Sequence, residues 1–489
     1  MKIKDLTAVE IGKKIRNGEL SATEVADELC ESFLSQDSEI NAYTAFDAEK
    51  IREEAKKTQE NIEKGKTNSI LAGVPIGIKD NICTKGELTT CASKILTGFK
   101  PPFDATVVSK VRNADMVVAG KLNMDEFAMG STSETSYYGA VKNPWNKDRV
   151  PGGSSGGAAA AVAAGEAVCA LGSDTGGSIR QPASYCGVTG FKPTYGAVSR
   201  YGLIAYASSL DQIGPIARDA LDCAAIMDVI AGADKMDSTS NEMENAGSFY
   251  NSMTGDVKGK TIGVPEECFG EGVDGEVRQS VENAIKELEK AGAVAKKIHL
   301  PFIRYAVPTY YIIATAEASS NLSRFDGVKY GFRADNCPSI DDLMINTRSE
   351  GFGAEVRKRI LLGTFVLSSG YYDAYYNKAL KMKRLIVEGF ETAFNECDAI
   401  VCPTSPMTAP KIGSSLSDSM KMYLSDIFTV SVNLAGLPGL SVPCGFDKDG
   451  MPIGAQIIGA AGRDKTVLNI GYAYQKATDY HLKRTGGLK

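Results

Sequence analysis

The chain has 489 residues, 43% of them apolar, and a formal net charge of −6. This length and apolar content suffice for a large buried core. Charges of both signs are mixed along the chain without a basic block, which argues against a protein that holds nucleic acid by itself.

The first 65 residues are predicted to be helical. Ser21 and Glu24 have the spacing of a capping box, in which the serine side chain accepts from the Glu24 amide and the glutamate reaches back. A second helix is predicted over 43–64, with Gly65 as its stop.

From residue 71 onward, short apolar runs alternate with longer helical patterns. This alternation predicts an α/β sheet covered by helices on both faces. We expect residues 1–489 to form a single domain, with a helical segment over 1–65 packed on a catalytic core of 66–489. The polar stretch 234–256 is predicted to be a surface excursion. The predicted strands are 74–78, 117–119, 167–171, 261–264, 293–300, 400–402, 440–443 and 455–458, and the predicted helices are 215–230, 277–290 and 465–477.

The cysteines follow no disulfide or metal pattern. Their number, eleven, is odd, no C-x-x-C pair occurs, and residues such as Cys169 and Cys402 lie in apolar or loop contexts. We expect reduced thiols in a cytoplasmic protein. The N-terminus lacks the apolar stretch of a signal peptide, and the weakly polar run 156–172 is too short and too mild to span a bilayer.

Two glycine- and serine-rich stretches, 151–157 and 172–180, stand close together in the sequence. Between them lie a predicted Ala-rich helix, 157–164, and the strand 167–171. A helix of about nine residues rises ~14 Å, and a strand of about six residues spans ~20 Å. If the chain runs up the helix and returns along the strand, Ser154 and Ser178 come close enough for contact.

The glycines near Ser178 suit a site that cleaves a carboxamide. Such a reaction passes through a tetrahedral oxyanion, and losing one backbone N–H that stabilises it costs about 3 kcal/mol. Glycine tolerates the dihedral angles that turn several amides inward. The predicted oxyanion hole is formed by the backbone of Thr175, Gly176, Gly177 and Ser178.

A serine nucleophile needs a base, and the two histidines, His299 and His481, are remote in sequence from both serines. Lys79 follows the apolar strand 74–78, which would carry it into the interior. Loss of hydration lowers the pKa of a lysine and favours the neutral amine, which accepts a proton. We predict a relay from Ser178 through Ser154 to Lys79 and back to the leaving ammonia, without a metal.

Each of these patterns also has a simpler explanation. A lysine after a strand is usually a surface residue, and Gly-Gly-Ser-Ser-Gly-Gly alone is often a linker. Two glycine-rich loops could also hold phosphate, although neither matches the P-loop or dinucleotide patterns. The lysine and the two glycine- and serine-rich stretches, found together in this order, indicate an amide-cleaving site more specifically than any one of them does.

That combination, in the stretches 73–80, 152–157 and 172–180, resembles the amidase signature family. The resemblance covers about residues 6–483 and shows no departure at the three catalytic positions. It implies an α/β/α sandwich with a large mixed central sheet. It also implies Ser178 as the nucleophile, Ser154 as a bridging serine in cis peptide geometry, and Lys79 as the base.

Within this family, the stretches 123–131, 321–327 and 370–376 are similar to those of the glutaminase subunits of aspartyl/glutamyl-tRNA amidotransferases. The resemblance implies hydrolysis of glutamine to glutamate and ammonia through an acyl-enzyme. It also implies a heterotrimer, in which ammonia is channelled to a B subunit that amidates Glu-tRNA(Gln), Asp-tRNA(Asn) or both. That B subunit would make most tRNA contacts and use ATP and Mg²⁺, a small C subunit would join the two, and this chain would need no cofactor.

The resemblance also assigns residues to the substrate. Free glutamine carries an α-carboxylate and an α-ammonium, so its site should offer one cation and one anion. Arg359 is assigned to the carboxylate, where its planar fork allows bidentate contact, and Asp426 to the ammonium. Tyr310 is assigned to the ammonia exit, with Tyr311 as a rival. The remaining candidate substrate contacts are Met129 and Ser131.

Two other functions stay open from the sequence. A stand-alone amidase for other carboxamides would need no partner and no Arg359–Asp426 pair. A non-catalytic scaffold would keep only the fold, which the intact Lys79, Ser154 and Ser178 disfavour. The sequence does not determine which aminoacyl-tRNA is the acceptor.

Overall fold

The computed structural model of the protein describes residues 3–242, 247–414 and 419–485. The strands are β1 (Tyr43–Ala45), β2 (Pro75–Lys79), β3 (Val117–Leu122), β4 (Cys169–Asp174), β5 (Thr189–Lys192), β6 (Gln212–Ala217), β7 (Thr261–Pro265), β8 (Val294–Ile298), β9 (Ala399–Pro403), β10 (Gly439–Phe446) and β11 (Pro452–Gly459). In the described residues these eleven strands form one sheet, in the order β1-β3-β2-β4-β6-β5-β10-β11-β9-β7-β8. β2 pairs parallel with β3 and β4, whereas β10 pairs antiparallel with β5 and β11. The sheet is therefore mixed, and the predicted fold class is confirmed.

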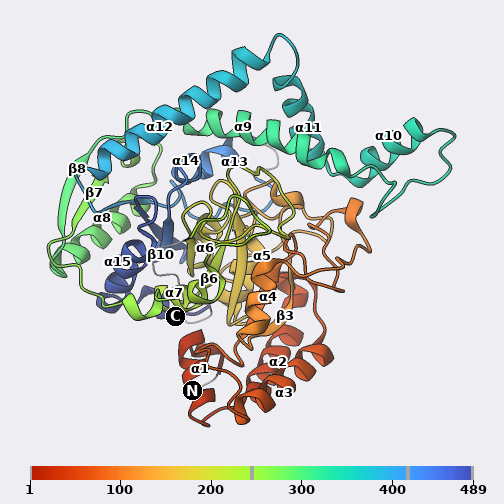
Figure 1. The fold of residues 1–489 in the computed structure, drawn as a ribbon. Coiled ribbons are helices and arrows are strands. Elements are labelled where there is room, and N and C mark those ends of the chain that lie inside the picture. The colour runs from red at the N-terminus through yellow and green to blue at the C-terminus, as the bar shows by residue number, and fades with distance from the viewer. Residues whose placement is uncertain (1–2, 243–246, 415–418, 486–489) are drawn as a thin grey trace.

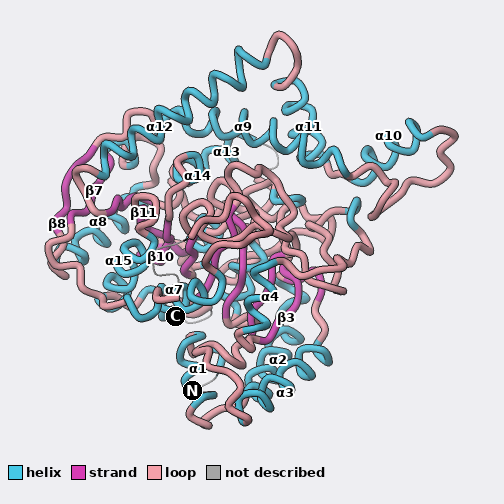
Figure 2. Tube along the Cα trace, in the orientation of Figure 1, coloured by secondary structure: helices cyan, strands magenta, loops and turns pink. Residues whose placement is uncertain are grey.

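Helices cover both faces of this sheet (Figure 1 and Figure 2). They are α1 (Ala8–Arg16), α2 (Ala22–Ile40), α3 (Ala48–Glu63), α4 (Thr106–Asn113), α5 (Gly156–Ala164), α6 (Arg180–Cys186), α7 (Ala220–Ile230), α8 (Gly275–Lys290), α9 (Ala306–Asn321), α10 (Ile340–Gly351), α11 (Ala354–Val366), α12 (Lys378–Phe394), α13 (Ser419–Ser425), α14 (Val430–Leu434) and α15 (Asp464–Ala477). α7, α8 and α15 pack on one face, and α5 and α6 on the other. α9, α11 and α12 form an outer layer (Figure 1).

Apolar residues alternate along the strands, so each face of the sheet has its own core. In β9, Val401 belongs to the core that includes residues of α8 and α15, whereas Cys402 belongs to the core that includes residues of α9 and α12, on the opposite face. In β2, Ile76 and Ile78 belong to the first of these cores. Because side chains alternate, Lys79 is directed to the other face, where α5 begins.

The N-terminal helices agree with the sequence patterns except at one boundary. The predicted capping box is confirmed, since the Ser21 side chain accepts from the Glu24 N–H and the Glu24 carboxylate accepts from the Ser21 N–H. The helix predicted over 43–64 is wrong at its start, because residues 43–45 form β1 on the edge of the sheet. Asp47 then caps α3 by accepting from the Lys50 N–H. A strand of three residues leaves almost no alternation to detect in a sequence.

The helix predicted over 215–230 is also wrong at its start. Residues 212–217 form β6, in which Pro215 pairs with Leu171 of β4, and α7 begins at Ala220 after its cap, Asp219. Proline is rare in central strands and common in a first helical turn, so the sequence favoured a helix there. The short strand β5, which contains Gly190, has no counterpart among the predicted strands.

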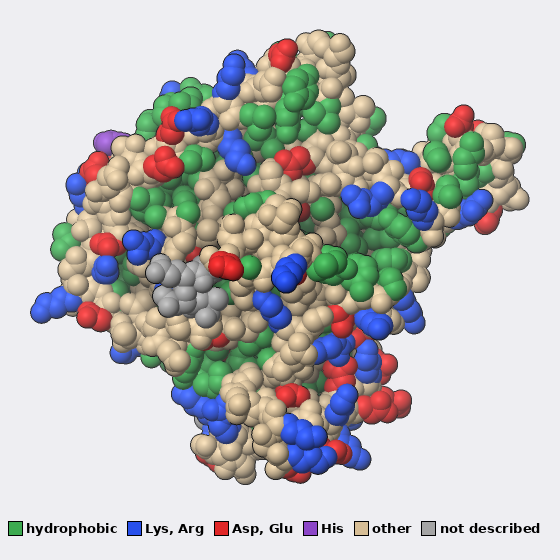
Figure 3. Space-filling model, viewed as in Figure 1, with side chains coloured by type: hydrophobic (Ala, Val, Ile, Leu, Met, Phe, Trp, Pro, Cys, Tyr) green, Lys and Arg blue, Asp and Glu red, His purple; other side chains and the backbone are tan. Residues whose placement is uncertain are grey.

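The outer helical layer is anchored by close backbone contact between α9 and α11. A Cβ atom on Gly363 of α11 would lie 1.9 Å from the Thr315 carbonyl oxygen of α9, so only glycine fits. The opposite side of α11 exposes Leu361 and Phe365, and Figure 3 shows hydrophobic side chains among charged ones on this layer. This close contact fixes the position of α11 on α9, and with it the position of the side chains on the inward face of α11.

Several predictions concern the chain as a whole. Of the helices in the described residues, none combines the length and apolar character that a membrane crossing requires. The eleven cysteines are unbridged. Within 234–256, residues 243–246 lie outside the described residues, and most of the remainder reaches solvent, although Phe249 is buried. The division of the chain at residue 65 stays a prediction.

Candidate active site

Lys79 lies at the end of β2 and is completely buried. Its Nζ is 2.8 Å from Ser154 Oγ, 2.8 Å from Ser155 Oγ and 3.2 Å from the Ser173 carbonyl oxygen. Burial lowers the pKa of Lys79 to about 7, although nearby carboxylates oppose this shift. Near neutral pH much of the side chain is therefore the neutral amine, as a base must be.

Ser154 and Ser155 precede α5 at a crowded point of the chain. The peptide bond between Gly153 and Ser154 is cis. The Gly153 N–H donates to Gln181 Oε1 at 3.0 Å. A Cβ atom on Gly153 would lie 2.0 Å from Asp125 Oδ2, so a larger residue would not fit between these side chains.

Ser178 lies beyond the end of β4, where the chain returns to the start of α5. The Ser155 N–H donates to the Ser178 carbonyl oxygen at 3.1 Å, so the two loops are in contact, as the lengths of helix and strand predict. The link from Ser154 to Lys79 is a hydrogen bond. Among the described residues, Ser178 Oγ has no hydrogen-bond partner. The link from Ser178 to Ser154 therefore stays a prediction.

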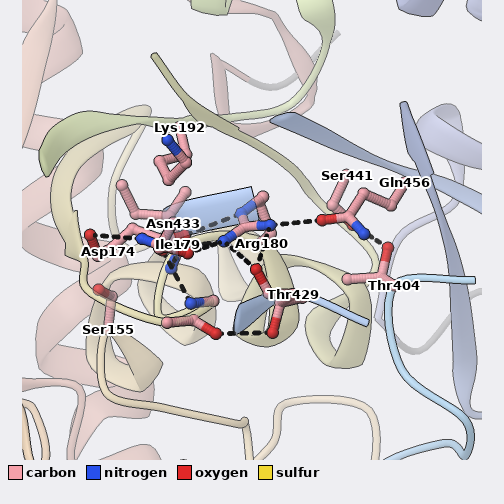
Figure 4. Close-up of polar contacts among 12 residues, drawn as sticks. Ser155, Asp174, Ile179, Arg180, Lys192, Thr404, Thr429, Asn433, Ser441 and Gln456 are labelled. Atoms are coloured by element: carbon pink, nitrogen blue, oxygen red, sulfur yellow. Dashed lines mark hydrogen bonds and ion pairs between the residues drawn. The ribbon is translucent and has the colours of Figure 1, made fainter. Parts of the chain in front are cut away.

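The loop 174–180 is anchored by a buried ion pair between Asp174 and Arg180 (Figure 4). The Asp174 carboxylate accepts from Arg180 Nε at 3.0 Å, and from the N–H groups of Gly177 at 2.8 Å and Ile179 at 3.1 Å. Burial acts to raise the pKa of Asp174, but the guanidinium and the other donors lower it to about 2. The carboxylate is therefore ionised and holds the turn that carries Ser178.

The predicted oxyanion hole is partly engaged in this conformation, because the Gly177 N–H already donates to Asp174. A Cβ atom on Gly176 would lie 2.7 Å from the Tyr310 ring, and one on Gly177 would lie 2.2 Å from Thr429 Oγ1. Both positions thus require glycine for space. The roles of the Thr175, Gly176 and Ser178 N–H groups stay predictions.

Arg359 of α11 and Asp426, which are far apart in the sequence, are both buried near this loop. Arg359 donates from Nε to Glu355 at 2.8 Å and from Nη1 to the Tyr206 hydroxyl at 2.8 Å. Its buried Nη2 has no hydrogen-bond partner among the described residues. The Ser131 hydroxyl donates to the Asp426 carboxylate. The fold therefore brings three of the predicted substrate residues into one cluster.

The remaining substrate candidates lie around this cluster. Burial raises the pKa of Asp426 to about 7, against the hydrogen bond from Ser131 and the charge of Arg359. Of the two rival tyrosines, Tyr310 lies against Gly176. The centre of the Tyr311 ring lies 5.3 Å from Cζ of the Arg359 guanidinium. Met129 is completely buried, and its contact with substrate stays a prediction.

Several residues of this region have no predicted role. Ser155, a second hydroxyl on Lys79, stands next to Ser154 in the same motif, so the sequence held a local indication of it. Gln181, Tyr206 and Thr429 had none, because each becomes relevant only through contact with a distant segment.

Neither histidine reaches this site. His299 is exposed beside Glu266 and Glu267, and His481 lies near the C-terminus, where burial lowers its pKa to about 4. Within the part of the chain that the structure describes, no group of three or more His, Cys, Asp or Glu side chains is placed to hold a metal ion. The basic side chain that contacts serine hydroxyls in this site is that of Lys79.

The serines, the buried lysine and the glycine-rich loop on a mixed sheet are the parts of an amide-cleaving enzyme. The Amidase family model matches residues 24–468, and the chain belongs to this family. A relative from Lachnospira eligens, named as the A subunit of glutamyl-tRNA(Gln) amidotransferase, is 59% identical over 98% of this chain and 99% of its own length. A relative of the same name from Agathobacter rectalis is 54% identical over 99% of this chain and 96% of its own.

Solved structures of the same fold differ in the functions that their names state. The glutamyl-tRNA(Gln) amidotransferase A subunit from Thermotoga maritima matches with a TM-score of 0.80 and 43% identity, over 97% of this chain and 95% of its own. A peptide amidase from Stenotrophomonas maltophilia matches with a TM-score of 0.84 and 27% identity, over 99% of both chains. The fold alone therefore does not decide the substrate.

Proposed function

We propose that the chain is the glutaminase component of a tRNA-dependent amidotransferase and hydrolyses glutamine to glutamate and ammonia. The name shared by near-full-length relatives supports this proposal. The observation that carries it is a buried guanidinium with an unused N–H group in one cluster with a buried carboxylate, near the Ser178 loop.

A zwitterionic amino acid is complementary to that cluster. Arg359 Nη2 would donate to the α-carboxylate, which removes an unsatisfied buried donor. Asp426 would accept from the α-ammonium, and a cation beside it lowers its pKa and favours the ionised form. An amide without these charges would leave both groups unpaired, at a cost in binding energy.

The proposed reaction begins when neutral Lys79 accepts the Ser154 proton while Ser154 accepts the Ser178 proton. Ser178 Oγ attacks the amide carbon, and backbone N–H groups stabilise the oxyanion. The C–N bond breaks, the proton returns along the relay to the nitrogen, and ammonia leaves a glutamyl ester on Ser178. Water, activated by the same relay, hydrolyses this ester to glutamate.

In this proposal the ammonia passes to a partner instead of being released. A B subunit binds the tRNA, uses ATP and Mg²⁺, and converts Glu-tRNA(Gln), Asp-tRNA(Asn) or both, and a small C subunit completes a cytoplasmic heterotrimer. The chain itself needs no cofactor. Tyr310, which lies against Gly176, would line the exit path of the ammonia.

The test compares Arg359→Ala with Arg357→Ala, which removes an exposed arginine from the same helix. We expect Arg359→Ala to raise the KM for glutamine by about 10- to 100-fold, as loss of a charge-assisted hydrogen bond would. Arg357→Ala should leave this KM unchanged. Ammonia release is measured on the full chain, purified with any partner proteins that accompany it.

Two results would contradict the proposal. An unchanged KM in Arg359→Ala would remove glutamine recognition from this cluster. Wild-type protein that cleaves neutral amides and leaves glutamine intact would be a stand-alone amidase.

A further inference from the structure

The segment 426–433 docks on the loop 174–180 through buried polar contacts (Figure 4). Asn433 Nδ2 donates to Asp174 Oδ1 at 2.9 Å. The Thr429 carbonyl oxygen accepts from Arg180 at 3.2 Å from both Nη1 and Nη2. This segment begins at Asp426, so one short piece of chain contacts both the loop that carries Ser178 and the ligand cluster.

Thr429 bridges these two parts through its side chain. It is fully buried, and its hydroxyl donates to the Gly176 carbonyl oxygen at 2.7 Å while lying 3.1 Å from the Asp426 carbonyl oxygen. The Thr429 hydroxyl oxygen also packs on Gly177, where no Cβ atom would fit. A single hydroxyl thus joins the loop 174–180 to the turn that presents the Asp426 carboxylate.

We propose that Thr429 is a positioning residue that couples binding of an α-ammonium group at Asp426 to alignment of the 176–178 backbone. That the ligand carries an α-ammonium group rests on the proposed function. The contacts of Thr429 with Gly176 and Asp426 are independent of it. Thr429 then determines part of the preference for amino-acid amides over amides that lack an ammonium group.

The loop needs such a restraint because it contains two adjacent glycines. Gly177 has a φ of +133°, a conformation that glycine adopts at low cost and also leaves at low cost. A hydrogen bond to the Gly176 carbonyl oxygen fixes the plane of the Gly176–Gly177 peptide, whose N–H donates to Asp174 and which is followed directly by the peptide that enters Ser178. Backbone N–H groups stabilise an oxyanion well only if they already point at it before reaction.

The connection from this restraint to the ligand is a tight turn. The Asp426 carbonyl oxygen accepts from the N–H groups of Thr429 at 3.0 Å and Val430 at 3.1 Å. An ammonium group paired with the Asp426 carboxylate would hold this turn in place, and the turn holds the hydroxyl against Gly176. With a ligand that lacks the ammonium group, only the protein's own hydrogen bonds would hold this turn in place.

The experiment compares Thr429→Val, which keeps the shape and removes the hydroxyl, with Thr429→Ser, which keeps the hydroxyl. Thr189→Val, at a buried threonine of β5, is the control for loss of a buried hydroxyl elsewhere. kcat and KM are measured for glutamine and for glutaric acid monoamide, which lacks only the α-ammonium.

We expect Thr429→Val to lower kcat for glutamine by about 10-fold with KM changed less than about twofold. The loss for the monoamide should be smaller, and Thr429→Ser and Thr189→Val should resemble wild type. In the Thr429→Val background, Asp426→Asn should no longer change the kcat ratio of the two substrates, because coupled residues are non-additive. An unchanged kcat in Thr429→Val, an effect on KM alone, or equal losses in Thr429→Val and Thr429→Ser would overturn the inference.

A second measurement separates this inference from the proposed function. Phenylmethanesulfonyl fluoride forms a bond from Ser178 Oγ to sulfur, fluoride leaves, and the hydroxyl proton passes to Lys79 through Ser154. If wild-type protein cleaves neither substrate, the glutaminase proposal and the ammonium coupling both fail. The positioning role then stands if Thr429→Val slows this sulfonylation and Thr429→Ser does not, and it falls if both react at the wild-type rate.

Discussion

The regions around Lys79 on β2 and Lys192 on β5 share their burial and differ in their neighbours. Burial lowers the pKa of both side chains to about 7. Lys79 Nζ contacts two serine hydroxyls, whereas Lys192 Nζ donates to the carbonyl oxygen of the next residue, Pro193, at 2.8 Å. Burial thus sets the proton affinity of a lysine in this sheet, and the neighbouring groups decide whether that affinity serves a reaction.

The largest expected effect separates these two lysines by activity. Lys79→Met should lower kcat/KM for glutamine by about 10³-fold, since it removes the proposed general base. Lys192→Met should change it by less than about threefold, because no hydroxyl among the described residues is hydrogen-bonded to that amine. Both variants are assayed for ammonia release after their folding is checked by thermal unfolding.

The pH profile provides the matching control. Lys79 accepts a proton only as the neutral amine, so kcat/KM of the wild type should rise with pH through about 7. Lys192→Met should keep this rise. Equal losses in the two variants, or a rise that disappears in Lys192→Met, would show that the two regions do not differ as their neighbours indicate.

A smaller effect distinguishes the two hydroxyls on Lys79. The Ser155 hydroxyl donates to the Ser173 carbonyl oxygen at 3.0 Å, so it accepts from Lys79 and has no proton left to relay. We expect Ser154→Ala to lower kcat by about 10² to 10⁴-fold, as loss of a proton-transfer group does, and Ser155→Ala by about 10-fold. Steady-state kinetics with glutamine measure both, and a larger loss in Ser155→Ala would exchange the two roles.

The smallest effect concerns stability and should be the same in both regions. The folded pKa of about 7 lies below the usual 10.5 of lysine, so the unfolded state binds more protons between these values. Stability therefore rises with pH across this window, by about 1.4 kcal/mol per pH unit from each lysine. Lys79→Met and Lys192→Met should each remove the part of this pH dependence that comes from the lysine it replaces.

Urea unfolding at pH 7, 8 and 9 measures the free energy of unfolding of each variant against wild type. The stability that a variant gains relative to wild type should be largest at pH 7 and shrink as pH rises. A difference that stays constant with pH would mean that burial does not lower the pKa of that lysine.

Local patterns were sufficient for much of the fold and for part of the site. The capping box at Ser21 and the strand before Lys79 depend on neighbours a few residues away, and both were predictable. The strand that contains Pro215 was not, because its partners on β4 and β5 override the local preference of proline. Proposed ligand residues such as Arg359 came from family resemblance, since nothing in their own stretches distinguishes them from surface charges.

By itself, the sequence determined the α/β class, the helix and strand that bring Ser154 and Ser178 to one place, and the order of the catalytic motifs. These depend on periodicity, glycine and short-range geometry, which a linear pattern records. Only the tertiary structure decided that Lys79 meets two hydroxyls, that Asp174 engages the Gly177 N–H, and that Thr429 reaches Gly176. Such contacts join segments up to about half the chain apart, and they exist only once both faces of the sheet have been packed.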